Sequence, residues 1–125
     1  MNFYLLISAI IIIVIGVVHS IVGEKLIIIP TLKLELPQIG GSDLIAGRTL
    51  RFAWHLTTLV WWAIAAMLIS FANQPLTPPA MIAVQIFSVA FFLSGITSLV
   101  IARGKHFSWY VFLTVSLLMW LGVKH

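Results

Sequence analysis

The chain has 125 residues, of which 62% are hydrophobic and only 8% are charged, and its formal net charge is +4 at pH 7. A soluble domain carries roughly a quarter of its residues as charged ones to cover its surface. This composition therefore excludes a soluble monomer and indicates a single integral membrane domain over residues 1–125. The absence of cysteine excludes disulfides and cysteine catalysis, and the basic residues of a membrane protein indicate topology rather than nucleic-acid binding.

Four apolar runs have the length of transmembrane helices, which need about 17–25 residues. They cover about 3–22, 49–71, 80–102 and 107–123. The first run can continue helically to Ile29 before Pro30 ends it. Short turns at 73–79 and 103–106 make neighbouring helices antiparallel, and Gly104 suits a positive φ in the second turn. The sequence therefore predicts an all-α, integral membrane four-helix bundle with one long connector between helices 1 and 2.

The connector at 24–47 contains an alternation of apolar and polar residues, "TLKLELP", from Thr31 to Pro37. Period two predicts a strand, or an extended amphipathic stretch at the membrane interface. The "GGSD" segment then interrupts it, and Ser42 or Asp43 is expected to cap a short lead-in helix to the second span. Two interpretations of the connector remain: a plain surface linker, or a lid over one mouth of the bundle.

Most of the charge lies on one side of the predicted bundle, because the connector and the 103–106 turn share that side. The charged residues there are Glu24, Lys25, Lys33, Glu35, Asp43, Arg48, Arg51, Arg103 and Lys105. The opposite side carries only Lys124 and the chain ends. The positive-inside rule then places the charged side in the cytoplasm and both termini outside.

Three histidines from different parts of the chain are expected at one depth beneath the charged face. His106 lies in the second turn, and His55 lies one helical turn inside Arg51, at a depth of about 6 Å. His19 precedes Lys25 by six residues and so lies about 9 Å inside it. Ionisable groups in a bilayer are kept where something solvates or uses them, so the histidines indicate a polar layer.

Helical spacing at 100° per residue gathers the polar residues of the first two helices on single faces. The second helix gathers Arg48, Arg51, His55, Thr58 and Trp62 on one face. The first gathers Gly16, His19, Ser20, Gly23 and Glu24. Small residues allow close packing of membrane helices, so the face of the first helix is expected to contact protein and to bring His19 and Glu24 with it.

Three interpretations of this cluster remain open. It can hold a divalent metal ion or haem, with ligands from His19, His55, His106 and Glu24 and with haem propionates held by Arg48, Arg51 and Arg103. It can bind an anionic lipid or another small anion through those arginines, in a pocket lined by Ser20, Thr58 and Trp62. It can also be purely structural in an accessory membrane subunit, with Glu24 paired to Arg48 or Arg51.

No sequence pattern marks out a nucleophile, so these residues leave enzymatic activity undecided. The expected partners are membrane lipid and either further copies of the chain or the other subunits of a membrane complex.

Three short motifs contain the same residues: His19-Ser20-x-x-Gly23-Glu24, Arg51-x-x-Trp54-His55 and Gly104-x-His106-x-x-Trp109. In this pattern the chain resembles a group of small bacterial four-span membrane proteins. The resemblance implies a multi-pass protein of the bacterial inner (cytoplasmic) membrane, and it implies that these residues belong together. It implies no particular activity.

Overall fold

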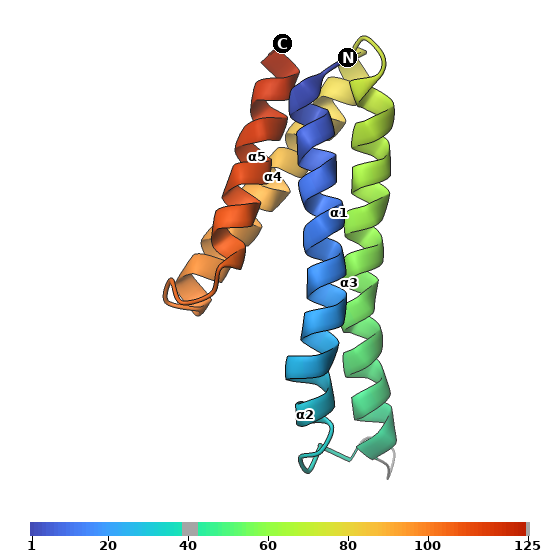
Figure 1. Ribbon diagram of the computed structural model, residues 1–125, viewed down its shortest axis with the longest axis vertical. Coiled ribbons are helices and arrows are strands. Elements are labelled where there is room, and N and C mark those ends of the chain that lie inside the picture. Colours follow the sequence, from blue (N-terminus) through green and yellow to red (C-terminus); the bar gives the residue numbers. More distant parts are fainter. Residues whose placement is uncertain (39–42, 125) are drawn as a thin grey trace. The chain divides into compact units, whose positions relative to one another are not determined.

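The computed structural model describes residues 1–38 and 43–124, and within these ranges it contains helices and no strand, as the all-α prediction requires. In chain order the elements are α1 (Phe3–Gly23), a π-helical turn η1 (Glu24–Ile28), α2 (Ile29–Thr31), α3 (Asp43–Ala72), α4 (Pro78–Ile101) and α5 (Ser108–Lys124) (Figure 1). Three helical stretches are long and apolar enough to cross a membrane: Phe3–Thr31, Leu44–Ala72 and Pro78–Ile101. The fourth helix, α5, is apolar but has only 17 residues, so its crossing stays a prediction.

The first helix runs past the proline that was expected to end it. The N–H of Ile29 donates to the carbonyl of Glu24, five residues earlier, which is the hydrogen bond of a π-helix. Pro30 has no N–H and its ring clashes with the carbonyl four residues back in a regular α-helix. The wider π turn makes room for that ring, and helical structure continues to Thr31.

The predicted strand in the connector does not form. Backbone turns replace it, because the N–H groups of Lys33 and Leu34 donate to carbonyls one turn earlier, whereas a lone strand would leave its backbone groups unpaired. Leu32 and Leu36 instead pack against Gly47 of α3, and Leu34 is 68% exposed. The connector therefore covers the start of α3 with two of its leucines.

The second long helix starts earlier than the predicted span. α3 begins at Asp43, so the expected lead-in helix and the span that was predicted from residue 49 are one continuous helix of 30 residues. Ser42, the other candidate cap, lies outside the described residues.

The chain divides into two compact units. One, here called the hairpin unit, comprises Ile13–Ala63. The other, the terminal unit, comprises Met1–Ile12 and Ile64–His125. Each unit has its own packing, described in turn below, and the organisation of residues 1–125 as one domain stays a prediction.

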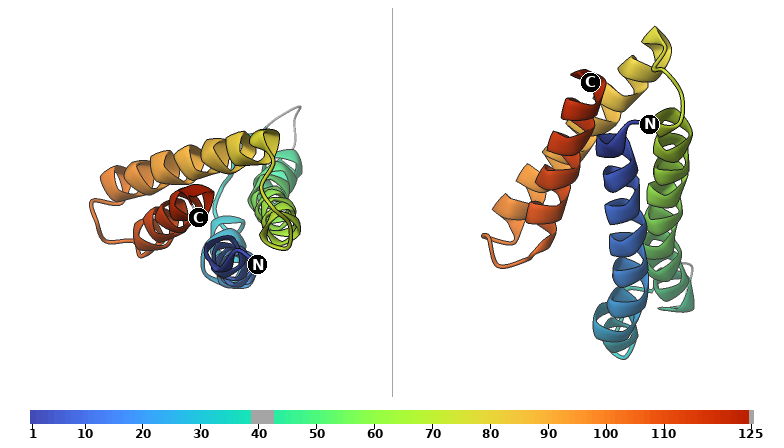
Figure 2. Two further views of the ribbon diagram at one scale, coloured as in Figure 1. Left: turned by 90° about the horizontal axis from the view of Figure 1, so that it is seen from above. Right: turned by 45° about the horizontal axis from the view of Figure 1, so that its top comes forward.

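In the terminal unit, α4 and α5 lie side by side (Figure 2). Two buried serines join them reciprocally: Ser88 Oγ donates to the carbonyl of Ser116 at 2.9 Å, and Ser116 Oγ donates to the carbonyl of Ser88 at 2.8 Å. Gly95 lies against Leu113, where a Cβ would approach the leucine side chain to 2.8 Å. Small residues with satisfied hydroxyls thus hold these two helices together, as is common between membrane helices.

The turn that follows α4 has the backbone expected at Gly104, which has φ +73°. Arg103 also has a positive φ, 49°. The N–H of Gly104 donates to the carbonyl of Leu99 and the N–H of Arg103 to that of Val100, at 2.9 and 3.2 Å. This pair of bonds is the Schellman ending of a helix, with an arginine in the position that glycine usually takes.

Candidate functional site: a Ser–His–Glu–Arg cluster in the hairpin unit

Two glycines of α1 provide the space for two tryptophans of α3. A Cβ on Gly16 would lie 2.6 Å from Nε1 of Trp62, and a Cβ on Gly23 would clash with the indole of Trp54. Each indole N–H also donates to a carbonyl of α1, from Trp62 to Ile13 at 3.3 Å and from Trp54 to His19 at 3.0 Å. The glycine-bearing face of α1 therefore contacts protein, as the helical spacing predicted.

His19 is held between aromatic rings. Its imidazole is parallel to the indole of Trp54, with ring centroids 4.4 Å apart and 2° between the planes. Trp61 lies on it at 4.9 Å with a tilt of 56°. His19 is thus held by aromatic packing. The next residue, Ser20, instead belongs to a series of hydrogen-bonded side chains.

Four side chains form this hydrogen-bonded series, here called the polar cluster: Ser20, Glu24, Arg51 and His55. Ser20 Oγ lies 2.6 Å from His55 Nδ1, and His55 Nε2 lies 3.2 Å from Glu24 Oε2. Arg51 holds the same carboxylate with two nitrogens, Nη2 at 2.8 Å from Oε1 and Nε at 3.3 Å from Oε2. Ser20 of α1 and Glu24 of η1 are four residues apart, as are Arg51 and His55 of α3, and this spacing places each pair on one helical face.

These contacts constrain where the protons of the polar cluster lie. Two N–H groups of Arg51 donate to Glu24, which is therefore an ionised carboxylate and can only accept hydrogen bonds. His55 Nε2 must then carry a proton and donate it to Glu24. In a neutral imidazole the other nitrogen, Nδ1, is an acceptor, so it receives the hydroxyl proton of Ser20. With His55 in its neutral form, the polar cluster is a directed series of hydrogen bonds from a serine hydroxyl through an imidazole to a carboxylate.

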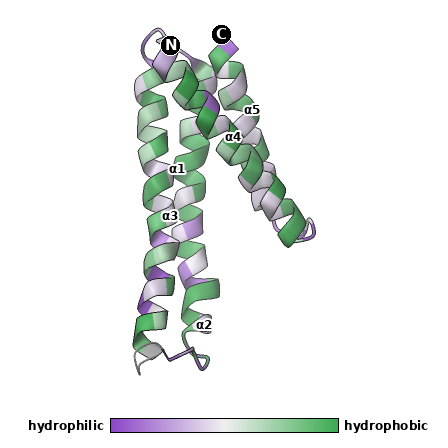
Figure 3. Cartoon of the chain, turned by 180° about the vertical axis from the view of Figure 1, so that it is seen from behind, coloured by the Kyte–Doolittle hydropathy of each residue, from purple (hydrophilic) through white to green (hydrophobic). Residues whose placement is uncertain are grey.

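The polar cluster is accessible from outside the hairpin unit. The side chains of Arg51, His55 and Glu24 retain 47%, 37% and 25% of their surface. Figure 3 shows hydrophilic residues on α1 and α3 toward the α2 end, next to hydrophobic helical turns. A ligand with a polar end can reach these side chains without separating α1 from α3.

Comparisons with family models, curated proteins and solved structures find no match for this chain.

The structure brings together part of the predicted site. Ser20, Glu24, Arg51 and His55 are in mutual contact, and the pairing of Glu24 with an arginine falls on Arg51. Thr58 is buried and lies beside Gly16, and its Oγ1 has no hydrogen-bond partner among the residues that the structure describes. The remaining predicted residues of α3 are Arg48, which is exposed, and Trp62, which packs on Gly16.

Two predicted site residues, Arg103 and His106, belong to the terminal unit. His106 Nδ1 lies 2.8 Å from the hydroxyl of Ser108, so its contact there is local. Their membership of the site stays a prediction. Within residues 1–38 and 43–124, no three or more His, Asp or Glu side chains gather as a metal-binding group.

Sequence reasoning assigned Ser20 to the lining of a pocket and missed its hydrogen bond to His55. Trp54 was not among the candidate site residues, although it stacks on His19 and fits against Gly23. One signal could have found the serine: Ser20 of α1 and Glu24 of η1 are four residues apart, and Arg51 and His55 are four apart on α3. When two helices are antiparallel, both residues of one such pair can contact both residues of the other pair.

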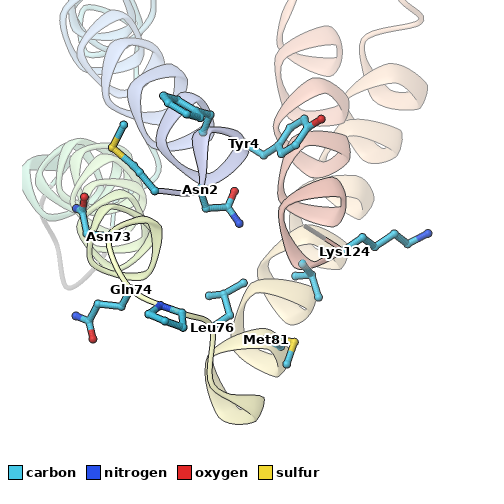
Figure 4. Close-up of a pocket in the computed structure, with 11 residues that line it drawn as sticks. Asn2, Tyr4, Asn73, Gln74, Leu76, Met81 and Lys124 are labelled. Atoms are coloured by element: carbon cyan, nitrogen blue, oxygen red, sulfur yellow. The ribbon is translucent and has the colours of Figure 1, made fainter.

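The terminal unit contains a cavity of about 710 Å³ that the sequence did not indicate. It lies where the loop of Asn73 and Gln74 meets the start of α1 and the end of α5 (Figure 4). Two of the amides that line it donate to backbone carbonyls, from Asn2 Nδ2 to Gly122 at 2.7 Å and from Asn73 Nδ2 to Ile69 at 2.8 Å. This cavity offers less chemistry than the polar cluster.

Proposed function

We propose that this protein crosses the bacterial inner membrane with four helices, has both termini outside, and binds the anionic headgroup of a membrane lipid at the charged end of the hairpin unit. The three long apolar helices support the membrane location. Self-association through lipid-facing surfaces, or assembly with other membrane subunits, is part of the same proposal.

The observation that carries the headgroup site is an excess of positive charge around the polar cluster. Lys25 and Arg48 are exposed there. In the part of the chain that the structure describes, Glu24 forms an ion pair with Arg51, and its other side-chain contact is the hydrogen bond with His55. Each lysine or arginine near a membrane surface attracts anionic lipid by about 1 kcal/mol. A phosphate can therefore bind beside Arg51 and the two exposed cations.

The hydrogen bonds of the polar cluster favour a headgroup over metal or haem ligation. Both ring nitrogens of His55 face protein atoms, Ser20 Oγ and Glu24 Oε2, so this imidazole would lose one of these contacts to become a ligand. One face of His19 is covered by Trp54. A Soret band, or a stoichiometric metal in the purified protein, would favour ligation and contradict the headgroup proposal.

Lipid binding by detergent-purified protein tests the site. Native mass spectrometry is expected to give tighter binding of phosphatidylglycerol than of phosphatidylcholine, and Arg48→Gln and Arg51→Gln should each weaken the former about fivefold, the equivalent of about 1 kcal/mol per cation. Lys124→Gln, which removes a cation from the end of α5, should change nothing. Inorganic phosphate as a competitor distinguishes a free-phosphate site from a lipid site. Equal affinity for both lipids would refute the proposal.

Cysteine labelling in intact cells tests the topology. The chain has no cysteine, so Gln74→Cys and Lys33→Cys each introduce a single thiol. An impermeant maleimide is expected to label the Gln74→Cys variant from outside, and the Lys33→Cys variant only after permeabilisation. The reverse pattern would place the termini in the cytoplasm.

A further inference from the structure

We infer that Ser20 is a nucleophile, activated by His55, for the acyl-ester carbonyl of a membrane lipid. This inference rests on the proposed headgroup site and adds a reaction to it. A nucleophilic hydroxyl needs a base within hydrogen-bond distance, and the base needs a third group that orients it. Ser20, His55 and Glu24 meet both conditions, at 2.6 and 3.2 Å.

The carboxylate makes His55 a base toward Ser20. Because Glu24 accepts the proton of Nε2, the lone pair of the imidazole lies on Nδ1, against the serine hydroxyl. Arg51 fixes the carboxylate from the other side. In the familiar serine hydrolase triad the two ring nitrogens have the opposite assignment, but the order of hydroxyl, base and carboxylate is the same.

The positions of these groups along the helices suit an ester bond of a phospholipid. Ser20 precedes Lys25 by five residues on α1 and its helical extension, and His55 follows Arg51 by four on α3. At 1.5 Å per residue, the hydroxyl and its base lie about 6–8 Å further along the hairpin unit than the cations. The ester carbonyls of a glycerophospholipid lie on the hydrocarbon side of its phosphate. A phosphate held by Arg51 and Lys25 therefore directs an ester toward Ser20.

The reaction needs only the lipid and water. Ser20 Oγ forms a bond to the carbonyl carbon, and its proton passes to His55 Nδ1. The bond from that carbon to the alcohol oxygen breaks, and the alcohol leaves with the proton from Nδ1. Water, deprotonated by the same nitrogen, then adds to the carbonyl carbon of the acyl-Ser20 ester. The bond from that carbon to Ser20 Oγ breaks, the fatty acid is released, and Ser20 Oγ takes back the proton from Nδ1. His55 Nε2 keeps its proton on Glu24 throughout.

Covalent labelling of the purified protein by an alkyl fluorophosphonate tests the nucleophile. The probe forms a phosphonate ester on an activated serine and releases fluoride, and peptide mass spectrometry locates the adduct. We expect labelling at Ser20, none in Ser20→Ala, and a rate about 100-fold lower in His55→Ala, as for loss of a general base. Ser94→Ala is the control, since Ser94 is exposed on α4 and donates to the carbonyl of Ala90. Wild-type protein that stays unlabelled at Ser20 would overturn the inference.

A cysteine variant separates activation from folding. Ser20→Cys introduces the only thiol of the chain, and its alkylation by iodoacetamide should persist to lower pH with His55 present than in Ser20→Cys/His55→Ala. Identical pH profiles would also overturn the inference. The two proposals have separate outcomes. Selective binding of phosphatidylglycerol without labelling of Ser20 would refute only the nucleophile. Labelling of Ser20 without lipid selectivity would refute the headgroup site but support the nucleophile.

Discussion

Gly23→Ala is expected to lower the free energy of unfolding by about 1–3 kcal/mol, the usual cost of one extra methyl group in a packed interface. A Cβ at this position would clash with three atoms of the Trp54 indole. The indole cannot move away freely, since it stacks on His19 and its N–H donates to the carbonyl of the same residue. Alanine stabilises a helix by about 1 kcal/mol relative to glycine. A net decrease in the free energy of unfolding would therefore come from the steric clash with Trp54.

Chemical denaturation of the detergent-solubilised protein measures this loss. Val18→Ile, which adds a methylene on the exposed side of α1, should leave the stability unchanged. In a double-mutant cycle, Gly23→Ala should cost much less in the Trp54→Leu background, because the clashing ring is gone. If the two substitutions were additive, the contact of Gly23 with Trp54 would not hold these helices together.

His55→Ala is expected to lower the free energy of unfolding by about 1–3 kcal/mol, because two hydrogen bonds are lost at a half-exposed position. Removal of the imidazole leaves the hydroxyl of Ser20 and one oxygen of Glu24 without their contact across the α1–α3 interface. His106→Ala serves as the matched control, since His106 is exposed and bonds only to Ser108 among the described contacts.

A double-mutant cycle that combines His55→Ala with Ser20→Ala identifies which contact accounts for the loss of stability. If the hydrogen bond between Ser20 and His55 stabilises the hairpin, the two substitutions together should cost less than the sum of their separate effects. An additive result would mean that the imidazole acts through its contact with Glu24 alone. The stability cycle and the labelling rates together separate a helix-pinning role of the polar cluster from a reactive one.

Local patterns in the sequence determined the helices of this protein. Long apolar runs predicted α4 and α5 within two residues of their observed ends, at 78–101 and 108–124. The same kind of reasoning identified the face of α1 that contacts protein, because helical spacing is a property of one segment. It failed in the connector, where period two in "TLKLELP" describes a strand only if a second strand is available to pair with it.

The tertiary structure alone decided which residues of α1 lie opposite which residues of α3. That register depends on Gly16 receiving Trp62 and Gly23 receiving Trp54, and neither the glycines nor the tryptophans specify their partners by spacing. Once the register is set, Ser20 and Glu24 lie on opposite nitrogens of His55. The sequence predicted one depth for His19, His55 and His106, but hydrogen bonds act over about 3 Å, and only packing across the interface brings atoms that close.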